Sequence, residues 1–142
     1  MLSRLIYVSR LVDTVDTRET RRILTSSLKN NPRRFVTGAL IFNSGHFIQW
    51  LEGSRSEISQ LFAHIAKDPR HTMVELIDFE SIAHRQFPDW SMGYIGEGVL
   101  NKALFARYSQ GFEFDPYQMS SASAVEFVRE AALVASRLSA AA

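Results

Sequence analysis

The chain has 142 residues, of which 46% are hydrophobic and 22% are charged, a composition typical of one ordinary globular domain with its own core. Sixteen basic residues against 15 acidic ones give a net charge of +1, which argues against a nucleic-acid-binding surface. The chain contains no cysteine, which excludes disulfides, thiolate metal sites and any chemistry that needs a cysteine adduct. No signal-peptide pattern and no window of roughly 18 apolar residues is present, so we expect a cytoplasmic protein outside the membrane.

The first half of the chain predicts a strand, a helix and a hairpin. Residues 2–10 form a β-rich segment in which Leu5, Tyr7 and Ser9 share one face. A capping box at Asp16 and Glu19 is expected to open a helix that ends at Pro32. Two further strands, residues 35–42 and 46–52, flank a turn at 43–45, and Gly38 indicates a bulge or a close backbone approach.

A second helix and two more strands follow. Ser54 and Glu57 form another capping box, and the apolar residues after it follow the i, i+3, i+4, i+7 spacing of a helix: Ile58, Leu61, Phe62 and Ile65. Lys67, Asp68 and Pro69 are expected to end this helix. Residues 74–82 and 90–95 predict the last two strands.

The order βαββαββ indicates a ferredoxin-like α+β sandwich with both helices on one face of the sheet. The pattern changes after Gly96, so we expect a domain over residues 1–96 and a two-helix extension over 97–142. Helical spacing at Leu100, Leu104 and Tyr108 predicts the first of these helices. Ser123 and Glu126 are expected to open the second, with one apolar face: Val125, Val128, Ala132, Ala135 and Leu138. The extension would cover the free sheet face or bind a partner.

Gln49 is the polar residue that the strand pattern leaves unexplained. It shares a strand face with Phe47 and Leu51, whereas Ile48, Trp50 and Glu52 point the other way. A buried amide without partners costs free energy, so Gln49 must form hydrogen bonds. Tyr7, Asn31, Trp90 and Met92 each have an ordinary structural explanation as core or helix-end residues. The four histidines are not at metal-ligand spacings, so no metal site is expected.

Five segments together resemble the BLUF domains, blue-light sensors that bind a flavin, usually FAD. They are RLIYVSR, NNPRRFVTGALIF, GHFIQWLEG, KDPRHTMVEL and FPDWSM, in the order and spacing of the family. The resemblance covers about two thirds of the chain and includes the positions matching the photoactive residues of the family: Tyr7, Asn31, Gln49, Trp90 and Met92. The length is also similar to that of short BLUF proteins that lack a fused output enzyme and end in two helices.

The resemblance implies a flavin site between the two helices and the sheet. Ile23, Leu24 and Ile65 would form its apolar walls, and Asn31, supported by Asn30, would bind the polar edge of the ring. Gln49 would bridge the ring and the Tyr7 hydroxyl. The ribityl and phosphate part would be held by Lys67, Asp68, Arg70 and His71, which otherwise read as an ordinary solvated turn. His64 stands where some short members carry an arginine. FAD is expected, with FMN or riboflavin as alternatives.

The implied mechanism is a light-driven switch without turnover. Tyr7 would give an electron and a proton, Gln49 would relay the proton, and Gln49 would end rotated or tautomerised. The strand carrying Trp90 and Met92 would pass this change to the C-terminal helices. Two other classes remain open, a small flavin-dependent oxidoreductase and a cofactor-free interaction module. The amphipathic last helix and the aromatic loop 112–119 are more apolar surface than a domain of this size can bury, which predicts self-association. The missing output domain predicts a separate signalling partner.

Overall fold

The computed structural model describes residues 1–12, 18, 22 and 30–141, with side chains described up to residue 138. The chain forms the strands β1 (Leu2–Leu11), β2 (Thr37–Asn43), β3 (His46–Ser54), β4 (His71–Ser81) and β5 (Gly93–Ile95). Its helices are α2 (Arg55–Ala66), α3 (Lys102–Tyr108) and α4 (Ser121–Ala141), with a short 3-10 helix at Pro116–Gln118. The capping box expected at Asp16 and Glu19 lies outside the described residues.

The five strands form one sheet in the order β4-β1-β3-β2-β5. Neighbouring strands run antiparallel except β5, which pairs parallel to β2. The register places Tyr7 of β1 opposite Gln49 of β3, and Gln49 opposite Leu40 of β2. Because residues directly opposite each other project from the same face, these three side chains form a row across the centre of the sheet.

The β2–β3 hairpin depends on two glycines. Gly45 follows Ser44 in the turn, and both have positive φ, 78° and 52°, which is the geometry of the tight turns that join antiparallel strands. Gly38 lies so close to β3 that a Cβ there would be 1.8 Å from the Trp50 carbonyl oxygen. The predicted close backbone approach at Gly38 is therefore confirmed.

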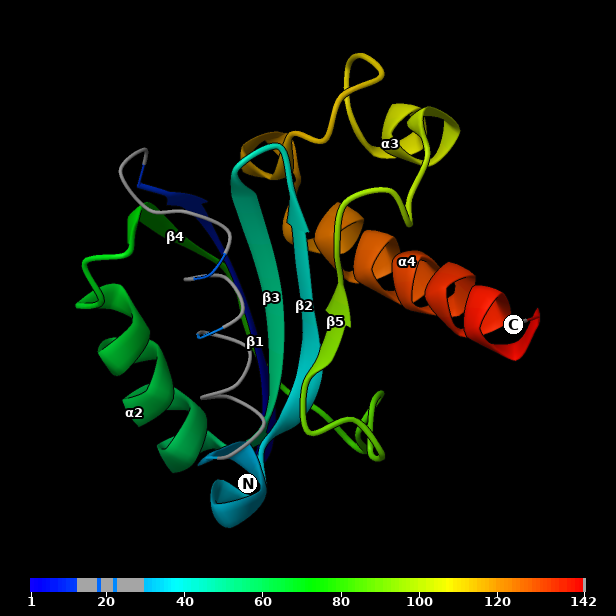
Figure 1. Ribbon diagram of the computed structural model, residues 1–142. Helices are drawn as coiled ribbons and strands as arrows, with labels where there is room; N and C mark the ends of the chain where they lie inside the picture. Colours follow the sequence, from blue (N-terminus) through cyan, green and yellow to red (C-terminus); the bar gives the residue numbers. More distant parts are fainter. Residues whose placement is uncertain (13–17, 19–21, 23–29, 142) are drawn as a thin grey trace.

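Helices cover both faces of the sheet. Figure 1 shows α2 on one side and α4 on the other. The α2 side buries Leu5, Tyr7, Leu40, Phe47 and Leu51, and the expected helix stripe packs on them. The side facing α4 buries Ile6, Ile48 and Trp50 together with residues of the tail. Of the two roles predicted for the C-terminal extension, the structure shows the first, because the extension covers the free sheet face.

Several predicted boundaries were wrong. Residues 30–34 are helical, so Pro32 does not end that helical segment. The fixed φ of proline is compatible with a helix. The segment ends instead where Val36 N donates to the Asn31 carbonyl. The helix α4 begins at Ser121, because the Ser120 hydroxyl accepts from Ser123 N and caps it. Its buried stripe is also rotated from the predicted one: Ala124, Phe127, Val128, Ala131 and Ala132 are buried, while Leu138 is exposed.

The capping of α2 follows the prediction. Ser54 Oγ accepts from Glu57 N at 3.2 Å, and Lys67 caps the C-terminal end. No helix within the described ranges is long and apolar enough to span a bilayer.

Candidate functional site

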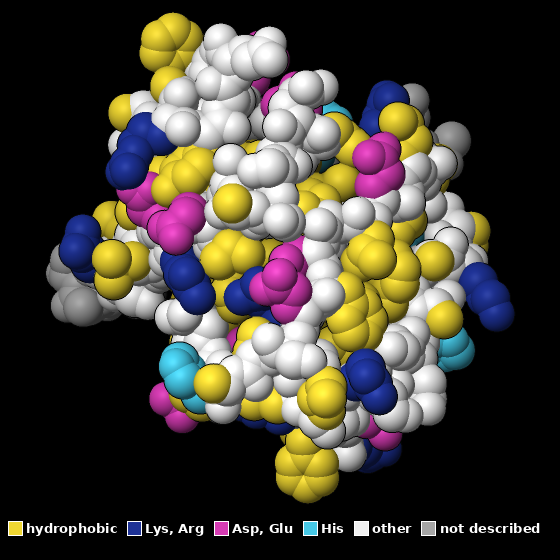
Figure 2. Space-filling view, turned by 180° about the vertical axis from the view of Figure 1, so that it is seen from behind, with side chains coloured by type: hydrophobic (Ala, Val, Ile, Leu, Met, Phe, Trp, Pro, Cys, Tyr) yellow, Lys and Arg dark blue, Asp and Glu magenta, His cyan; other side chains and the backbone are white. Residues whose placement is uncertain are grey.

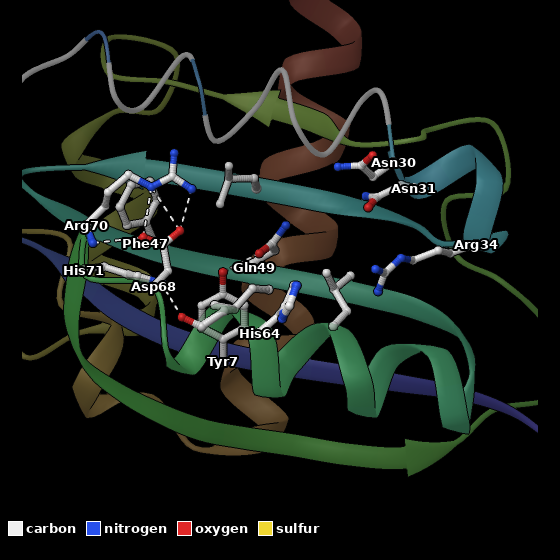
Figure 3. Close-up of a pocket in the computed structure, with 13 residues that line it drawn as sticks. Tyr7, Asn30, Asn31, Arg34, Phe47, Gln49, His64, Asp68, Arg70 and His71 are labelled. Carbon is white, nitrogen blue, oxygen red and sulfur yellow. Dashed lines mark hydrogen bonds and ion pairs between the residues drawn. The ribbon is translucent and has the colours of Figure 1, made fainter.

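A cavity of about 260 Å³ lies between α2 and the centre of the sheet. Figure 3 shows polar side chains grouped at its two ends, with Gln49 between them. Asn30 and Asn31 stand at one end, and Asp68 and Arg70 at the other. The lining is completed by Tyr7, Arg34, Leu40, Phe47, Gln49, Leu61, His64, Ile65 and His71.

Gln49 has the partners that its burial requires. Only 3% of the residue is exposed, and the Tyr7 hydroxyl donates to its Oε1. Its Nε2 donates to Met92 Sδ at 3.3 Å. A thioether sulfur is a weak acceptor, so the amide is held firmly on its oxygen side and loosely on its nitrogen side. The contact to Met92 is therefore the weaker of the two hydrogen bonds that orient the amide.

Tyr7 stays protonated in this site. Burial raises the pKa of its hydroxyl well above the ordinary value, and the negative charge of Asp68 raises it further. The neutral hydroxyl therefore remains a hydrogen-bond donor to Gln49 across the physiological pH range.

Asn31 links the cavity to the segment that precedes β5. The residue is 2% exposed and its Nδ2 donates to the Ser91 carbonyl at 2.9 Å. Asn30, one position earlier, also lines the cavity but is exposed. Both amides thus line the cavity from the helical residues 30–34, just before β2.

The opposite end of the cavity carries charge. The Arg70 guanidinium hydrogen-bonds both carboxylate oxygens of Asp68, with Nε at 2.9 and 3.0 Å from them. These bonds lower the pKa of the Asp68 carboxyl, so it is ionised at neutral pH. Lys67 does not line this cavity but borders an open depression next to it, with His64 and Asp68.

His71 uses both ring nitrogens inside the protein. Its Nε2 lies 2.8 Å from the Ile65 carbonyl, which can only accept, so Nε2 carries the proton. The Nδ1 atom then accepts from the Ser9 hydroxyl at 2.9 Å. His71, the first residue of β4, therefore links the end of α2 to β1. These two hydrogen bonds hold the charged end of the cavity in place.

Acidic pH is expected to destabilise the fold through His71. Burial lowers the pKa of His71 below its ordinary value of 6.5. The folded chain then binds fewer protons than the unfolded chain at slightly acidic pH, so the free energy of unfolding falls as the pH drops below about 6.5. Urea unfolding at a series of pH values measures this loss. His71→Gln should flatten the profile, whereas His84→Gln, at an exposed position, should leave it unchanged.

Trp90 and Met92 would share a face in the predicted strand over residues 90–95, but the structure places them on opposite faces of the sheet. The strand β5 begins only at Gly93, and residues 90–92 are irregular because their main chain binds elsewhere: the Trp90 carbonyl accepts from Gly38 N at 3.0 Å. Trp90 stacks on Phe87, with centroids 5.3 Å apart, on the α4 side of the sheet. Met92 is buried on the α2 side beside Gln49.

Most residues expected at the site come together. Tyr7, Asn30, Asn31, Gln49, His64, Ile65, Asp68, Arg70 and His71 all line the cavity. Ile23 and Leu24 lie outside the described residues. Sequence reasoning missed Arg34, Leu40, Phe47 and Leu61 as lining residues. The strand alternation and the helix stripe already placed Phe47 and Leu61 beside Gln49 and Ile65, so those two could have been found.

The cavity suits a planar heterocycle with an anionic tail. Apolar side chains of Leu40, Leu61 and Ile65 offer surfaces for a ring, while the amides of Asn31 and Gln49 offer donors and acceptors at its edge. The Arg70 guanidinium, held by Asp68, places N–H donors at one end. This donor set fits a flavin.

Comparisons with known proteins identify the family of this chain. Residues 2–93 match the BLUF family, described as sensors of blue-light using FAD. The photoactivated adenylate cyclase subunit beta of Euglena gracilis is 28% identical over 100 residues, which are 70% of this chain and 12% of the cyclase subunit. The blue light- and temperature-regulated antirepressor BluF of Escherichia coli strain K12 is 36% identical over 78 residues, 54% of this chain and 19% of BluF. This chain therefore spans only a small part of these curated relatives.

Two solved structures match over nearly their whole length. The dark-state structure of BlrB, a BLUF protein, is 33% identical with a TM-score of 0.76, and the match covers 95% of this chain and 96% of BlrB. The photo-activated state of BlsA is 28% identical with a TM-score of 0.83, covering 92% of this chain and 94% of BlsA. Because the family match extends over almost two thirds of the sequence and includes the Tyr7–Gln49 pair, this chain belongs to the BLUF family of blue-light sensors.

Proposed function

We propose that this chain is a blue-light photoreceptor that binds FAD in the α2 cavity and signals without catalysing a reaction. The observation that carries the proposal is the buried Gln49 amide, which faces the cavity between a strong donor, Tyr7, and a weak acceptor, Met92. The similarity to BlrB, a BLUF protein matched over 96% of its chain, supports a sensor over an enzyme.

The proposed contacts of FAD follow the two ends of the cavity. Asn31, with Asn30 beside it, would bind the polar edge of the ring, and Ile65 and His64 would border the ring from α2. Arg70 and Lys67 would bind the ribityl and phosphate part at the other end. Asp68 would hold the Arg70 guanidinium in place, and His71 would hold the turn between α2 and β4 through its hydrogen bond to the Ile65 carbonyl.

When bound, the flavin supplies light absorption and, once excited, a strong tendency to take up an electron. The Tyr7 phenol lines the cavity and donates to Gln49, and we assign it the role of electron and proton donor. Gln49 relays the proton, and electron and proton both return to Tyr7 when the separated charges recombine, before the dark recovery begins. The lasting change is then confined to hydrogen bonds.

Rotation of the Gln49 amide would change both of its protein contacts. With Oε1 and Nε2 exchanged, Tyr7 would face an N–H donor and Met92 would lose the one it has now. Met92 directly precedes β5, and β5 lies beside β2 on the sheet that α4 covers. The change at Gln49 would thereby reach the C-terminal helices, from which we propose that a separate partner protein reads the signal.

An absorption spectrum in darkness and after a blue flash tests the proposal. We expect a yellow protein whose flavin bands shift slightly to the red and recover in the dark. Bleaching of the bands, or reduction of the flavin by NADH in darkness, would instead indicate a redox enzyme. A colourless protein that cannot be reconstituted with FAD, FMN or riboflavin would contradict the flavin site itself.

A further inference from the structure

One end of the molecule exposes a row of apolar side chains. Phe35 is 79% exposed, Met1 73% and Phe79 38%. Met1 connects the other two, because it borders one surface depression with Phe35 and an adjoining one with Phe79. Figure 2 shows apolar and basic side chains together at the lower end of the molecule, the end at which Figure 1 places the N-terminus. Contiguous exposed apolar surface of this kind marks interaction sites.

The backbone of Phe35 makes this exposure unusual. Phe35 follows the helical residues 30–34 and has φ 56°, while Phe35 N donates to the Pro32 carbonyl and Val36 N to the Asn31 carbonyl. This is the helix-ending position at which glycine is preferred, because a Cβ is strained in the left-handed conformation. The ring of Phe35 is not buried, so the strain is not offset by core packing. Folding alone therefore does not account for phenylalanine here.

Arginines surround the apolar row. Arg33, Arg34 and Arg85 border the depression at Phe35, and Arg55 borders the adjoining one. Among the described residues that line the two depressions, Glu57 is the single acidic one. Arg33 and Arg34 form no ion pair within the described ranges of the chain.

Arg85 has a different role from the other arginines. Its guanidinium donates to the Phe35 carbonyl at 2.7 Å and to the Glu52 carbonyl at 3.0 Å. These bonds tie the left-handed turn to the end of β3 and fix the backbone that carries the Phe35 ring. A side chain presented from an ordered backbone costs less entropy to bind than one on a mobile loop, which suits an anchor for a partner.

We propose that this end of the chain binds an acidic segment of another protein in which Asp or Glu residues alternate with apolar ones. Its binding surface, which we call the Phe35 surface, consists of Met1, Arg33, Phe35, Arg55 and Phe79, while Arg85 holds the backbone of Phe35. Guanidinium groups match carboxylates with paired hydrogen bonds, and the two depressions accept apolar side chains between them. The inference concerns a site apart from the α2 cavity and does not require that a flavin be bound.

A protein segment fits this surface better than a lipid membrane does. Membrane-surface binding relies on an amphipathic helix that inserts a broad apolar face, or on clusters of four to eight Lys or Arg residues. Here the apolar groups rim two hollows, and the arginines come from three separate segments of the chain instead of one amphipathic helix.

The segment 30–35 also borders the cavity on its other side through Asn30, Asn31 and Arg34. A partner on the Phe35 surface would thus contact a segment shared with the cavity wall.

Selection from a random dodecapeptide display library tests the proposal directly. The full chain with its bound cofactor, kept in darkness, is the bait, and selected peptides are then assayed against Phe35→Gly and Arg33→Glu. We expect peptides rich in Asp, Glu and apolar residues whose affinity falls at least roughly tenfold on either variant, as for removal of an interface anchor. Phe35→Gly should also raise the melting temperature by about 2–4 °C, because it relieves the left-handed strain. Lost binding in a stabilised variant cannot result from unfolding.

Two matched variants serve as controls. Phe112→Gly removes another exposed aromatic side chain, and Lys102→Glu reverses another exposed charge, both outside the Phe35 surface. Neither should weaken the selected peptides. The proposal fails if no peptide distinguishes the wild-type chain from Phe35→Gly, or if the selected peptides are basic or uncharged. Sedimentation with phosphatidylserine vesicles that is lost in Phe35→Gly would assign the surface to a membrane and would also overturn it.

Discussion

Replacing Tyr7 with Phe is expected to leave a folded, flavin-loaded protein that no longer shows the light-induced red shift. The substitution removes one oxygen atom and keeps the ring, which packs against Phe62 with centroids 5.7 Å apart. It removes the donor to Gln49 Oε1 and, in the proposed mechanism, the source of the electron and proton. Flash difference spectroscopy on the purified variant measures the amplitude of the shift, which should fall to the baseline.

The stability cost of this change should be small. Gln49 keeps its contact to Met92 but loses one hydrogen bond at a buried acceptor, which costs about 1 kcal/mol. Tyr117→Phe is the matched control: its hydroxyl donates to the Met73 carbonyl at 2.8 Å, away from the cavity. That variant should retain the full red shift. A normal photocycle in Tyr7→Phe would show that Tyr7 is not the donor.

The face on which each strand residue lies could be predicted because alternation in a strand is a local property. Gln49 and Tyr7 were correctly assigned to the face that carries Leu5 and Leu51. Their direct pairing could not be derived from alternation, since it depends on the register between β1 and β3. The resemblance to a family supplied that pairing in advance.

The segment before β5 shows where local pattern fails. Trp90 and Met92 are two positions apart and would share a face in a strand. The carbonyls of Trp90 and Ser91 are instead taken by Gly38 and Asn31, more than 50 residues earlier in the chain. These distant contacts turn the two side chains to opposite sides of the sheet, which no local periodicity indicates.

The burial of Glu52 was also missed, although the argument made for Gln49 applies to it: a polar residue on a strand face with apolar neighbours needs hydrogen-bond partners. Glu52 shares a strand face with Ile48 and Trp50, and it is fully buried. Each of its carboxylate oxygens accepts two hydrogen bonds: Oε1 from Trp50 Nε1 and Gln86 N, and Oε2 from Thr37 Oγ1 and Phe87 N. A charged residue at a strand end is usually exposed, and only the fold shows that the loop after β4 closes over this one.

Glu52→Gln is expected to destabilise the fold by about 3 kcal/mol. The substitution replaces one acceptor oxygen with an NH₂ group that must face two donors. Whichever way the amide turns, a backbone N–H of Gln86 or Phe87 loses its acceptor, and Thr37 can adapt only by rotating its hydroxyl. Buried donors left without partners cost about 1–3 kcal/mol each, and bonds to a charged group are stronger than neutral ones. Urea unfolding followed by circular dichroism measures the loss.

The effect should extend to the position of Met92. Phe87, held by Glu52, packs on Trp50 with centroids 5.2 Å apart and stacks on Trp90, whose carbonyl binds Gly38. Loosening this loop would weaken the hold on Met92 beside Gln49, so a Glu52→Gln protein that still binds flavin should show an altered rate of dark recovery. Glu75→Gln, on the exposed part of β4, should change neither the free energy of unfolding beyond about 0.5 kcal/mol nor the recovery rate. Equal stability of Glu52→Gln and Glu75→Gln would mean that the four hydrogen bonds at Glu52 do not hold the loop.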